Sequence, residues 1–424
     1  MLLVLLLSLL WSWFVVRWYI GDTLAEYLNP EVNTIEMARR AVSLAPSDPL
    51  THWRLGEFIQ KQLPPENLPQ AIAEYEKAVS LAPNDYRLWM SLGIAIEQSG
   101  DSERAETALR RAVALAPSYS YPAWYLGNLL LRSGRYQEAF AELRRASESN
   151  DELRSQLFNL AWEVYSSDLE SLKNAIGDTV EIRLHFSRYL LDRGRFEDGL
   201  RVWQSLGESE QHKHRDTGRE IVTKLLEAKR FHDALIVWNG LQKAREHPAE
   251  TGTDRVLSET GKILDGGFEA GLAHGLESVF GWQVKSMPQV QVGIDPNHAK
   301  SGRRSLRLRF QVQSKLDAIS ISQLVVVDPG VEYDFECFSR TEKLESISTP
   351  LIQIVDATDG SVLASTPEAA SGSSEWQNLS LKFKSGEKTQ AIIVRVARNP
   401  CAGNDVCPIY GIVWYDDFTL KRSS

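Results

Sequence analysis

Two adjacent acidic residues stand near the end of the 424-residue sequence, in "WYDDFTL" at 414–420. The surrounding residues are typical of a β-strand, so Asp416 and Asp417 are expected to point to opposite faces of a sheet. Carboxylates on opposite faces cannot act as acid and base across one substrate bond. Asp416 would share the buried face of Phe418 and Leu420, where a carboxylate needs a metal ion, an arginine or a turn to cap. Asp417 would face water or join the metal site.

No other pattern supports catalysis. The sequence has no phosphate-binding loop, no G-x-S-x-G elbow and no H-E-x-x-H zinc motif. His212 and His214, in "QHKH", are two residues apart in a polar stretch, which favours a solvated loop over a metal pair. We therefore expect a non-enzymatic protein. The alternative, a glycan-active enzyme, needs two carboxylates about 5–10 Å apart in a cleft.

The composition is that of a globular protein, with 43% hydrophobic and 24% charged residues. The formal net charge is −9, and no stripe of lysine and arginine is interleaved with aromatic residues. Proteins that bind nucleic acid usually present such a basic face. The sequence therefore predicts no nucleic-acid partner.

The first 20 residues, "MLLVLLLSLLWSWFVVRWYI", carry no charge before Arg17. About 20 apolar residues span a bilayer as a helix. Tryptophans and Tyr19 suit the membrane interface, and Arg17 can reach the headgroups. We predict a transmembrane anchor over 1–20. A buried core helix is one alternative; a cleaved signal peptide is another, although the basic start and the small-residue cleavage site are missing.

Two signals conflict about the side of the membrane. Arg17, Arg39 and Arg40 follow the anchor and favour a cytoplasmic body by the positive-inside rule. Cys401 and Cys407 bracket five residues of a loop and are close enough to form a small disulfide ring, which favours an oxidising compartment. We predict a periplasmic or extracellular soluble part. An adaptor that faces the cytoplasm is the alternative.

The middle of the chain repeats with a period of 34 residues. Three sets of residues carry the period: Ala71, Ala105 and Ala139; Ala78, Ala112 and Ala146; Pro83 and Pro117. A glycine precedes the second helix of each pair, at Gly56, Gly93 and Gly127, and an insertion at 62–69 displaces the first. Small residues let two helices approach closely, and proline ends the second helix.

This pattern resembles the tetratricopeptide repeat, which residues Trp89, Leu92, Gly93, Ile96, Ala105, Leu109, Ala112 and Pro117 match in order. The resemblance implies stacked helical hairpins over 30–150, with degenerate repeats over 151–242. It also implies an inner groove that binds a protein partner. One subset of the family clamps a peptide's terminal carboxylate, and of Glu57, Ile94 and Asn128 only Asn128 fits that clamp. Asn128 is thus the candidate groove residue, and capture of a terminal carboxylate is not expected. The alternative is a spacer without a ligand.

A polar segment at 243–262 is expected to be a linker, after which the hydrophobic period changes from 3.6 to 2. In "SLRLRF", Leu306, Leu308 and Phe310 alternate with polar residues. Several such strands, separated by "DPG", "TDG" and "SGS", predict a β-sandwich or jelly roll over 263–424.

The phrases "LDGGFEAG", "GW", "AKSGRRSLRL", "WQNLSLKF" and "WYDDFTL" occur in an order similar to that of galactose-binding-like jelly rolls among carbohydrate-binding modules. The resemblance implies a structural calcium ion held by Glu269, a backbone carbonyl at Lys300, and Asp416 or Asp417. It also implies sugar binding by an outward aromatic ring, for which Phe338 is the candidate. Trp282, Trp376 and Trp414 are expected to be framework residues.

The predicted fold class is therefore a multidomain α-then-β chain: a transmembrane helix, an α-solenoid of tetratricopeptide repeats and a C-terminal jelly roll. The predicted function is a membrane-anchored adaptor. The repeat groove would bind a protein, and the jelly roll would bind a polysaccharide, in the assembly or export of an envelope polysaccharide. A purely structural scaffold is the alternative.

Overall fold

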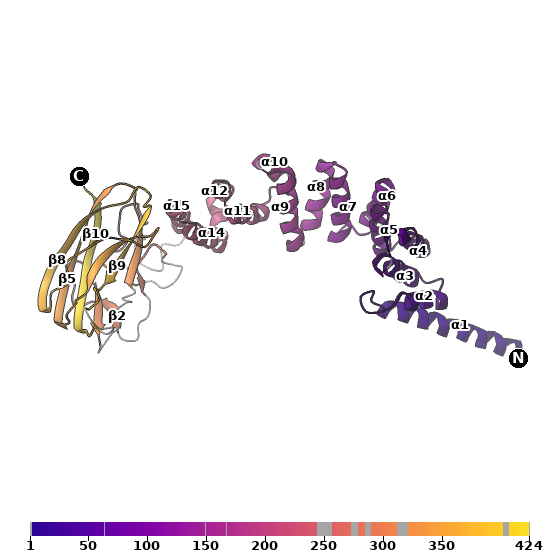
Figure 1. Ribbon diagram of the computed structural model, residues 1–424, viewed down its shortest axis with the longest axis horizontal. Helices are drawn as coiled ribbons and strands as arrows, with labels where there is room; N and C mark the ends of the chain where they lie inside the picture. The colour runs from indigo at the N-terminus through magenta and orange to yellow at the C-terminus, as the bar shows by residue number, and fades with distance from the viewer. Residues whose placement is uncertain are drawn as a thin grey trace. The chain divides into compact units, whose positions relative to one another are not determined.

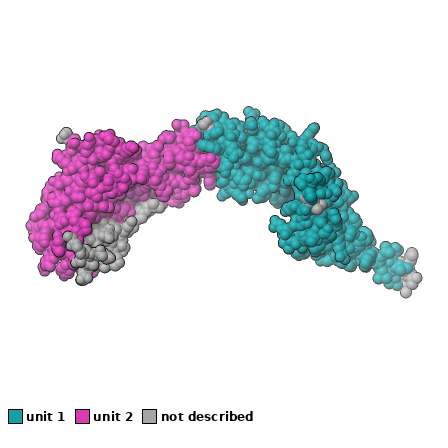
Figure 2. Space-filling model, viewed as in Figure 1, with its two compact units in different colours: residues 1–182 teal, residues 183–424 magenta. Residues whose placement is uncertain are grey.

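A computed structural model describes most of the chain as two compact units, residues 1–182 and residues 183–424 (Figure 2). The residues that it describes are 2–62, 64–148, 150–166, 168–243, 257–272, 279–284, 290–311, 321–401 and 407–423. Most of the predicted linker, residues 244–256, lies outside these ranges.

Unit 1 is a series of helical hairpins (Figure 1). Its helices are α1 (Leu2–Tyr27), α2 (Ile35–Leu44), α3 (Pro49–Gln62), α4 (Leu68–Leu81), α5 (Tyr86–Gln98), α6 (Ser102–Leu115), α7 (Ser120–Arg132), α8 (Tyr136–Ser147), α9 (Asp151–Tyr165) and α10 (Leu169–Ile176). The insertion in the repeat forms a short 3₁₀ helix, η1 (Pro65–Asn67), between α3 and α4. Aspartates cap helices such as α5 and α6, since Asp85 accepts a hydrogen bond from Arg87 N–H and Asp101 from Arg104 N–H.

Three of the hairpins close over a glycine of their first helix. A Cβ atom on Gly93 would lie 2.7 Å from Leu109 Cγ, and one on Gly127 would lie 2.7 Å from Leu143 Cγ. Gly56 packs in the same way against the ring of Tyr75. The repeated glycines are therefore explained by close helix packing, as the sequence predicts.

The helix α1 has two different parts. By length and composition, Val4–Tyr27 could cross a membrane, and it is the one such helix among the described residues. Its early side chains are exposed, for example Trp11 at 71%. Its last turns belong to the array: Ala25 is fully buried, and a Cβ on Gly21 would lie 2.7 Å from Ala45 Cβ. The helix therefore continues without a break into the first hairpin with α2.

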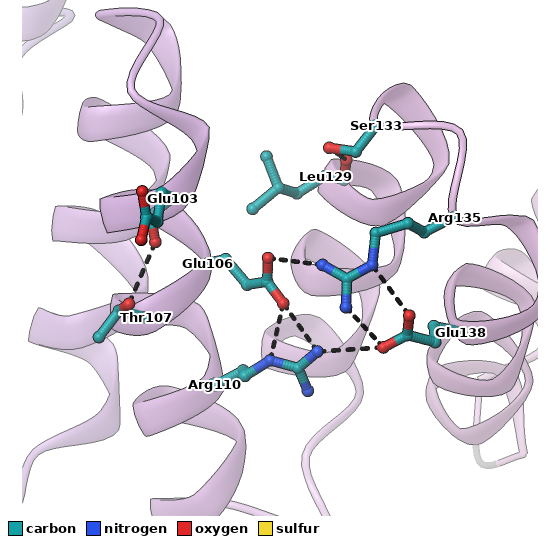
Figure 3. Close-up of polar contacts among 8 residues, drawn as sticks. All are labelled: Glu103, Glu106, Thr107, Arg110, Leu129, Ser133, Arg135 and Glu138. Carbon is teal, nitrogen blue, oxygen red and sulfur yellow. Dashed lines mark hydrogen bonds and ion pairs between the residues drawn. The ribbon is translucent and has the colours of Figure 1, made fainter.

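Ion pairs link successive hairpins on the second helices. Figure 3 shows Glu106 and Arg110 of α6 meeting Arg135, at the start of α8, and Glu138 of α8. Arg135 lies 2.7 Å from Glu106 and 2.6 Å from Glu138, and Arg110 lies 2.7 Å from Glu106 and 3.3 Å from Glu138. The four charges alternate in sign, so they hold neighbouring repeats in register, with a strength that salt will reduce.

Unit 2 begins with further helices: α11 (Val180–Asp192, whose first residues lie in unit 1), α12 (Phe196–Gln204), α13 (Glu208–Lys213), α14 (Arg215–Glu227) and α15 (Phe231–Lys243). They include the segments that the sequence identifies as degenerate repeats. The glycine contact recurs here, because a Cβ on Gly218 would lie 2.7 Å from Leu241 Cδ2.

The rest of unit 2 contains two antiparallel sheets in the described ranges. Their orders are β1-β4-β9-β6-β7 and β2-β3-β10-β5-β8. The strands are β1 (Gln283–Val284), β2 (Val290–Asp295), β3 (Ser305–Phe310), β4 (Ile321–Val326), β5 (Glu332–Glu345), β6 (Leu351–Asp356), β7 (Val362–Ser365), β8 (Gly372–Lys384), β9 (Ala391–Ala397) and β10 (Tyr410–Arg422). Alternate side chains of both sheets, such as Leu308 and Val394, share one hydrophobic core.

The last helical hairpin of unit 2 contacts the β region directly. The rings of Trp238 and Phe280 lie 6.3 Å apart, edge to face. Asn239 Nδ2 donates to the carbonyl of Ser258 at 2.8 Å, and Lys229 Nζ donates to the carbonyl of Thr358 at 2.5 Å. These contacts explain why the last helices and the β region form one compact unit.

Candidate functional site

The first helices of three hairpins line a groove in unit 1. The groove has a volume of about 670 Å³ and is lined from α5, α7 and α9 by Ile94, Glu97, Gln98, Trp124, Tyr125, Asn128, Arg132, Gln156, Asn159 and Leu160. These residues include two aromatic rings, two aliphatic side chains and four amides. Apolar surface with a few fixed polar groups is typical of a ligand site.

The charged residues of the groove are paired with each other. Arg132 Nε donates to Glu97 Oε1 at 2.8 Å, which joins α5 to α7. Asn128 Nδ2 donates to the carbonyl of Trp124 at 2.9 Å, one turn earlier on the same helix. The predicted residue Asn128 thus does line the groove. No sequence motif identifies Trp124, Glu97 and Arg132 as groove residues, although Trp124 lies only four residues before Asn128 in the same helix.

In unit 2, the two aspartates of the final strand meet one loop. Asp416 is fully buried, and its Oδ2 accepts from the N–H groups of Lys300 at 2.7 Å and Ser301 at 3.3 Å. Asp417 Oδ1 accepts from Ser301 Oγ at 2.5 Å. Asp416 therefore caps a turn, which is one of the roles that the sequence leaves open.

The expectation that Asp416 shares the face of Phe418, opposite Asp417, is wrong. Asp416 pairs with Phe338, on the outer face of the sheet, while Tyr415 and Phe418 both enter the core. A β-bulge between Asp416 and Thr419 adds one residue, and Asp417 takes a positive φ of 56°. The bulge brings both carboxylates to Ser301.

A close contact between the backbones of Phe418 and Gly266 fixes the position of this bulge. Phe418 N–H donates to the carbonyl of Gly266 at 3.0 Å, and a Cβ on Gly266 would overlap the carbonyl of Phe418. Only glycine fits here. The first glycine of "LDGGFEAG" is therefore required by the approach of segment 257–272 to the final strand.

Two more carboxylates, Asp265 and Glu269, lie in segment 257–272, which precedes β1. Glu269 Oε1 accepts from the N–H groups of Arg303 at 2.6 Å and Arg304 at 3.1 Å. Asp265, which the sequence analysis missed, accepts from the N–H groups of Glu269 and Ala270. Burial raises the pKa of Asp265 to about 6, and burial also raises the pKa of Asp416, in both cases against the effect of these backbone hydrogen bonds.

The predicted calcium ligands are thus neighbours in space. A Cβ on Gly267 would lie within 4.0 Å of side-chain atoms of Glu269, Asp416 and Asp417. The donors are oxygens, the kind that calcium prefers. In the described residues, however, no three acidic, histidine or cysteine side chains are arranged to hold a metal. Most of the carboxylate oxygens named above point at N–H groups, and calcium remains a prediction.

Phe338 lies on the outer face of the second sheet, as expected, and is partly covered. Lys300 Nζ lies 4.9 Å from the centre of its ring. Trp282 and Trp414 are buried, the latter with its Nε1 donating to Asp295 Oδ2 at 2.8 Å. Asp295 is another buried acid that no sequence motif identifies. Burial alone would raise the pKa of Asp295, but hydrogen bonds from Trp414 and neighbouring groups outweigh burial and lower this pKa.

The predicted pair Cys401 and Cys407 is bonded, with the Cα atoms 5.5 Å apart. The intervening residues 402–406 lie outside the described ranges. Cys337 is a buried free thiol in β5, on the core side as the alternation predicts.

The stacked hairpins and their inner groove define unit 1 as a helical-repeat binding array. The family model "Tetratricopeptide repeat" matches residues 66–120 and 98–152. The chain therefore carries a tetratricopeptide repeat array, followed by a two-sheet antiparallel β region.

Several solved structures show some similarity to this chain. A MamA RS-1 ArsTM double mutant is 23% identical, with 33% of this chain and 75% of that chain covered and a TM-score of 0.27. A crystal structure of MamA is 19% identical, with 37% of this chain and 90% of that chain covered and a TM-score of 0.29. The crystal structure of YrrB, a TPR protein with an unusual peptide-binding site, is 15% identical, with 50% of this chain and 95% of that chain covered and a TM-score of 0.25. No curated protein matches the chain.

Proposed function

We propose that this chain is a membrane-anchored, non-catalytic adaptor whose repeat groove binds an extended segment of a partner protein. The groove between α5, α7 and α9 carries the proposal, because it combines aromatic and aliphatic surface with amide side chains. Amides on fixed helices suit the alternating N–H and C=O groups of an extended peptide, and the rings suit an apolar side chain.

The segment bound is internal to the partner rather than its C-terminus. Arg132 is the cation of the groove lining, and it is already paired with Glu97. A terminal carboxylate would have to break this ion pair. A neutral segment with one or two apolar side chains keeps the pair and covers Trp124 and Leu160.

Selection from a library of short peptides tests this function. Peptides selected on the full-length protein should lose at least tenfold in affinity when Asn128→Arg fills the groove, as measured by calorimetry. Arg111→Ala, an exposed change on α6, is the matched control and should leave affinity unchanged. Equal binding by the wild type and Asn128→Arg would contradict the groove as the site.

Residues 1–20 anchor the adaptor in a membrane, with the array and β region in the periplasm or outside the cell. The exposed apolar part of α1 supports the anchor, and the Cys401–Cys407 pair supports an oxidising side. Cysteine alkylation in intact cells, with and without reductant, tests the side. Free Cys401 and Cys407 in cells that receive no reductant would favour the cytoplasm.

The β region, 263–424, is a jelly roll that binds a glycan through the outer face around Phe338, and calcium at Glu269, Lys300, Asp416 and Asp417 stabilises it. The two-sheet architecture and the outward ring support glycan binding. The ion would supply a positive charge among four carboxylates if Asp265 is included. The setting that we propose is the assembly or export of an envelope polysaccharide. The competing function is a structural scaffold whose β region binds no glycan.

A further inference from the structure

A buried arginine lies against the disulfide at one edge of the β region. Arg398 follows β9 and is 7% exposed. Its Nε donates to the carbonyl of Ser348 at 2.8 Å, and its Nη2 donates to Ser346 Oγ at 2.7 Å and contacts Cys407 Sγ at 3.1 Å. The guanidinium therefore touches a sulfur atom that is only weakly able to accept a hydrogen bond while it is in a disulfide.

Arg398 forms no ion pair with an acidic side chain of the described residues. Its Nη1 is buried without a hydrogen-bond partner there. The acid that acts on it electrostatically, Glu368, binds Ser348 Oγ, the N–H of Thr349 and Asn399 Nδ2 instead. Burial lowers the pKa of Arg398 to about 10, so the group is still a cation at neutral pH. A buried cation without an anion is costly.

We propose that Cys401–Cys407 is a redox-active disulfide that exchanges with a dithiol, and that Arg398 holds Cys407 as a thiolate in the reduced state. Reduction creates, 3.1 Å from this guanidinium, an anion that no acidic side chain of the described residues supplies in the oxidised state. An interaction that stabilises the reduced form makes the disulfide easier to reduce than a structural one.

The difference in exposure between the two cysteines sets the direction of exchange. Cys401 is partly exposed, whereas Cys407 is 4% exposed. A thiolate of the dithiol attacks Cys401 Sγ, a new S–S bond forms there, and the electron pair of the old bond leaves on Cys407 Sγ. The better-stabilised thiolate is the better leaving group. The two cysteines thus have separate roles, Cys401 as the sulfur attacked and Cys407 as the leaving group.

The second thiol of the reductant completes the exchange. It attacks its own partner sulfur in the mixed disulfide and releases Cys401, which takes up a proton. The net reaction converts the protein disulfide and a dithiol into a Cys401 thiol, a Cys407 thiolate, an oxidised dithiol and one proton. The dithiol supplies both electrons.

Cys337 provides an internal comparison. It is fully buried in the core, and burial raises the pKa of its thiol well above the usual range. We expect Cys337 to remain an unreactive thiol under conditions that reduce Cys401–Cys407.

The equilibrium with dithiothreitol tests the proposal. The full-length protein in detergent is titrated with reduced and oxidised dithiothreitol at pH 7, and the cysteines are alkylated and quantified by mass spectrometry. Arg398→Met should shift the equilibrium about tenfold towards the disulfide, which corresponds to a potential about 30 mV more negative. Ser346→Ala removes one hydrogen bond of Arg398 but keeps its charge, and should keep the wild-type potential.

A second measurement covers the case in which Arg398→Met does not fold. In Cys401→Ser, the ultraviolet absorbance of the Cys407 thiolate at pH 7 should persist with Arg398→Lys, which keeps the charge, and should fall with Arg398→Gln. Equal potentials for the wild type and Arg398→Met, or equal thiolate absorbance with Lys and Gln, would overturn the proposal.

Discussion

The N–H of Lys300 donates a 2.7 Å hydrogen bond to Asp416 Oδ2, across 116 residues of sequence. This bond joins the loop between β2 and β3 to the final strand, and Ser301 adds a bond to each of the two aspartates. Burial raises the pKa of Asp416, which means that its ionised form lacks a full countercharge. A cation at this place would supply one.

Calcium should therefore stabilise the β region. At a concentration about a hundredfold above its dissociation constant, it should add about 2.7 kcal/mol to the free energy of unfolding, and a chelator should remove this gain. Glu269→Gln should abolish the effect, while Glu345→Gln, an exposed change in β5, should retain it. Thermal unfolding with calcium and with chelator is the measurement. If calcium leaves both curves unchanged, the carboxylates act only as hydrogen-bond acceptors.

The hairpins could be predicted from the sequence because their determinants are local. Gly93 and Leu109 lie within one repeat, and the same contact recurs as Gly127 with Leu143. The lining of the groove was only partly predictable. Asn128 follows from its place in the motif, but the pairing of Glu97 with Arg132 depends on how two hairpins stack.

The bulge in β10 could not be predicted. Strict alternation places Asp416 with Phe418, and one additional residue reverses that assignment. What imposes the extra residue is the contact between Phe418 and Gly266, two segments far apart in sequence. The sequence shows the glycine but not which strand approaches it.

A methyl group at a packed glycine should destabilise the array. Gly93→Ala places a Cβ 2.7 Å from Leu109 Cγ and should lower the free energy of unfolding by about 1–3 kcal/mol. Gly240→Ala is the matched control in α15, because its Cβ would approach only Gln211 Oε1, at 3.9 Å. It should stabilise by about 1 kcal/mol through helix propensity. Urea unfolding measures both, and a neutral Gly93→Ala would contradict the close packing.

His52 should make stability depend on pH. Its two ring nitrogens face acceptors, Glu74 Oε2 at 2.6 Å and the carbonyl of Pro46 at 2.9 Å, so both donate only when the ring is protonated. The hydrogen bond with Glu74 raises the pKa of His52 above 6.5, while burial opposes it. This contribution is complete below the unfolded pKa and is lost as pH rises through the folded pKa.

The role of His52 is tested by the variant Glu74→Gln, in which the free energy of unfolding should lose this pH dependence. Below about pH 6.5, Glu74→Gln should cost about 1.5–3 kcal/mol, the usual range for a hydrogen bond to a charged group, and the cost should shrink at higher pH. Urea unfolding from pH 6 to pH 9 is the measurement. A cost that is independent of pH would mean that His52 is neutral in the folded protein.

Glycan binding should depend on Phe338. Phe338→Ala removes the ring on the outer face of the second sheet, beside Lys300, and should reduce binding to a glycan array by at least tenfold. Ile347→Ala is the control, since Ile347 is 89% exposed and lies outside that face. Equal loss in both variants, or no binding by the wild type, would favour the structural scaffold.

Two deletions should distinguish the membrane-binding part of α1, before Arg17, from the part that packs in the first hairpin. Residues 17–28 contact α2 and α3: Arg17 donates to the carbonyl of Ser43, and Arg54 Nε donates to the carbonyl of Ala25 at 3.0 Å. In the segment 1–16, the described side chains, 4–16, are all exposed. Deletion of 1–16 should therefore move the shortened chain to the soluble fraction with its unfolding midpoint unchanged. Deletion of 1–28 should also lower that midpoint, because Ala25 and Leu28 are core residues. A shortened chain that stays with the membrane would show that another surface binds it.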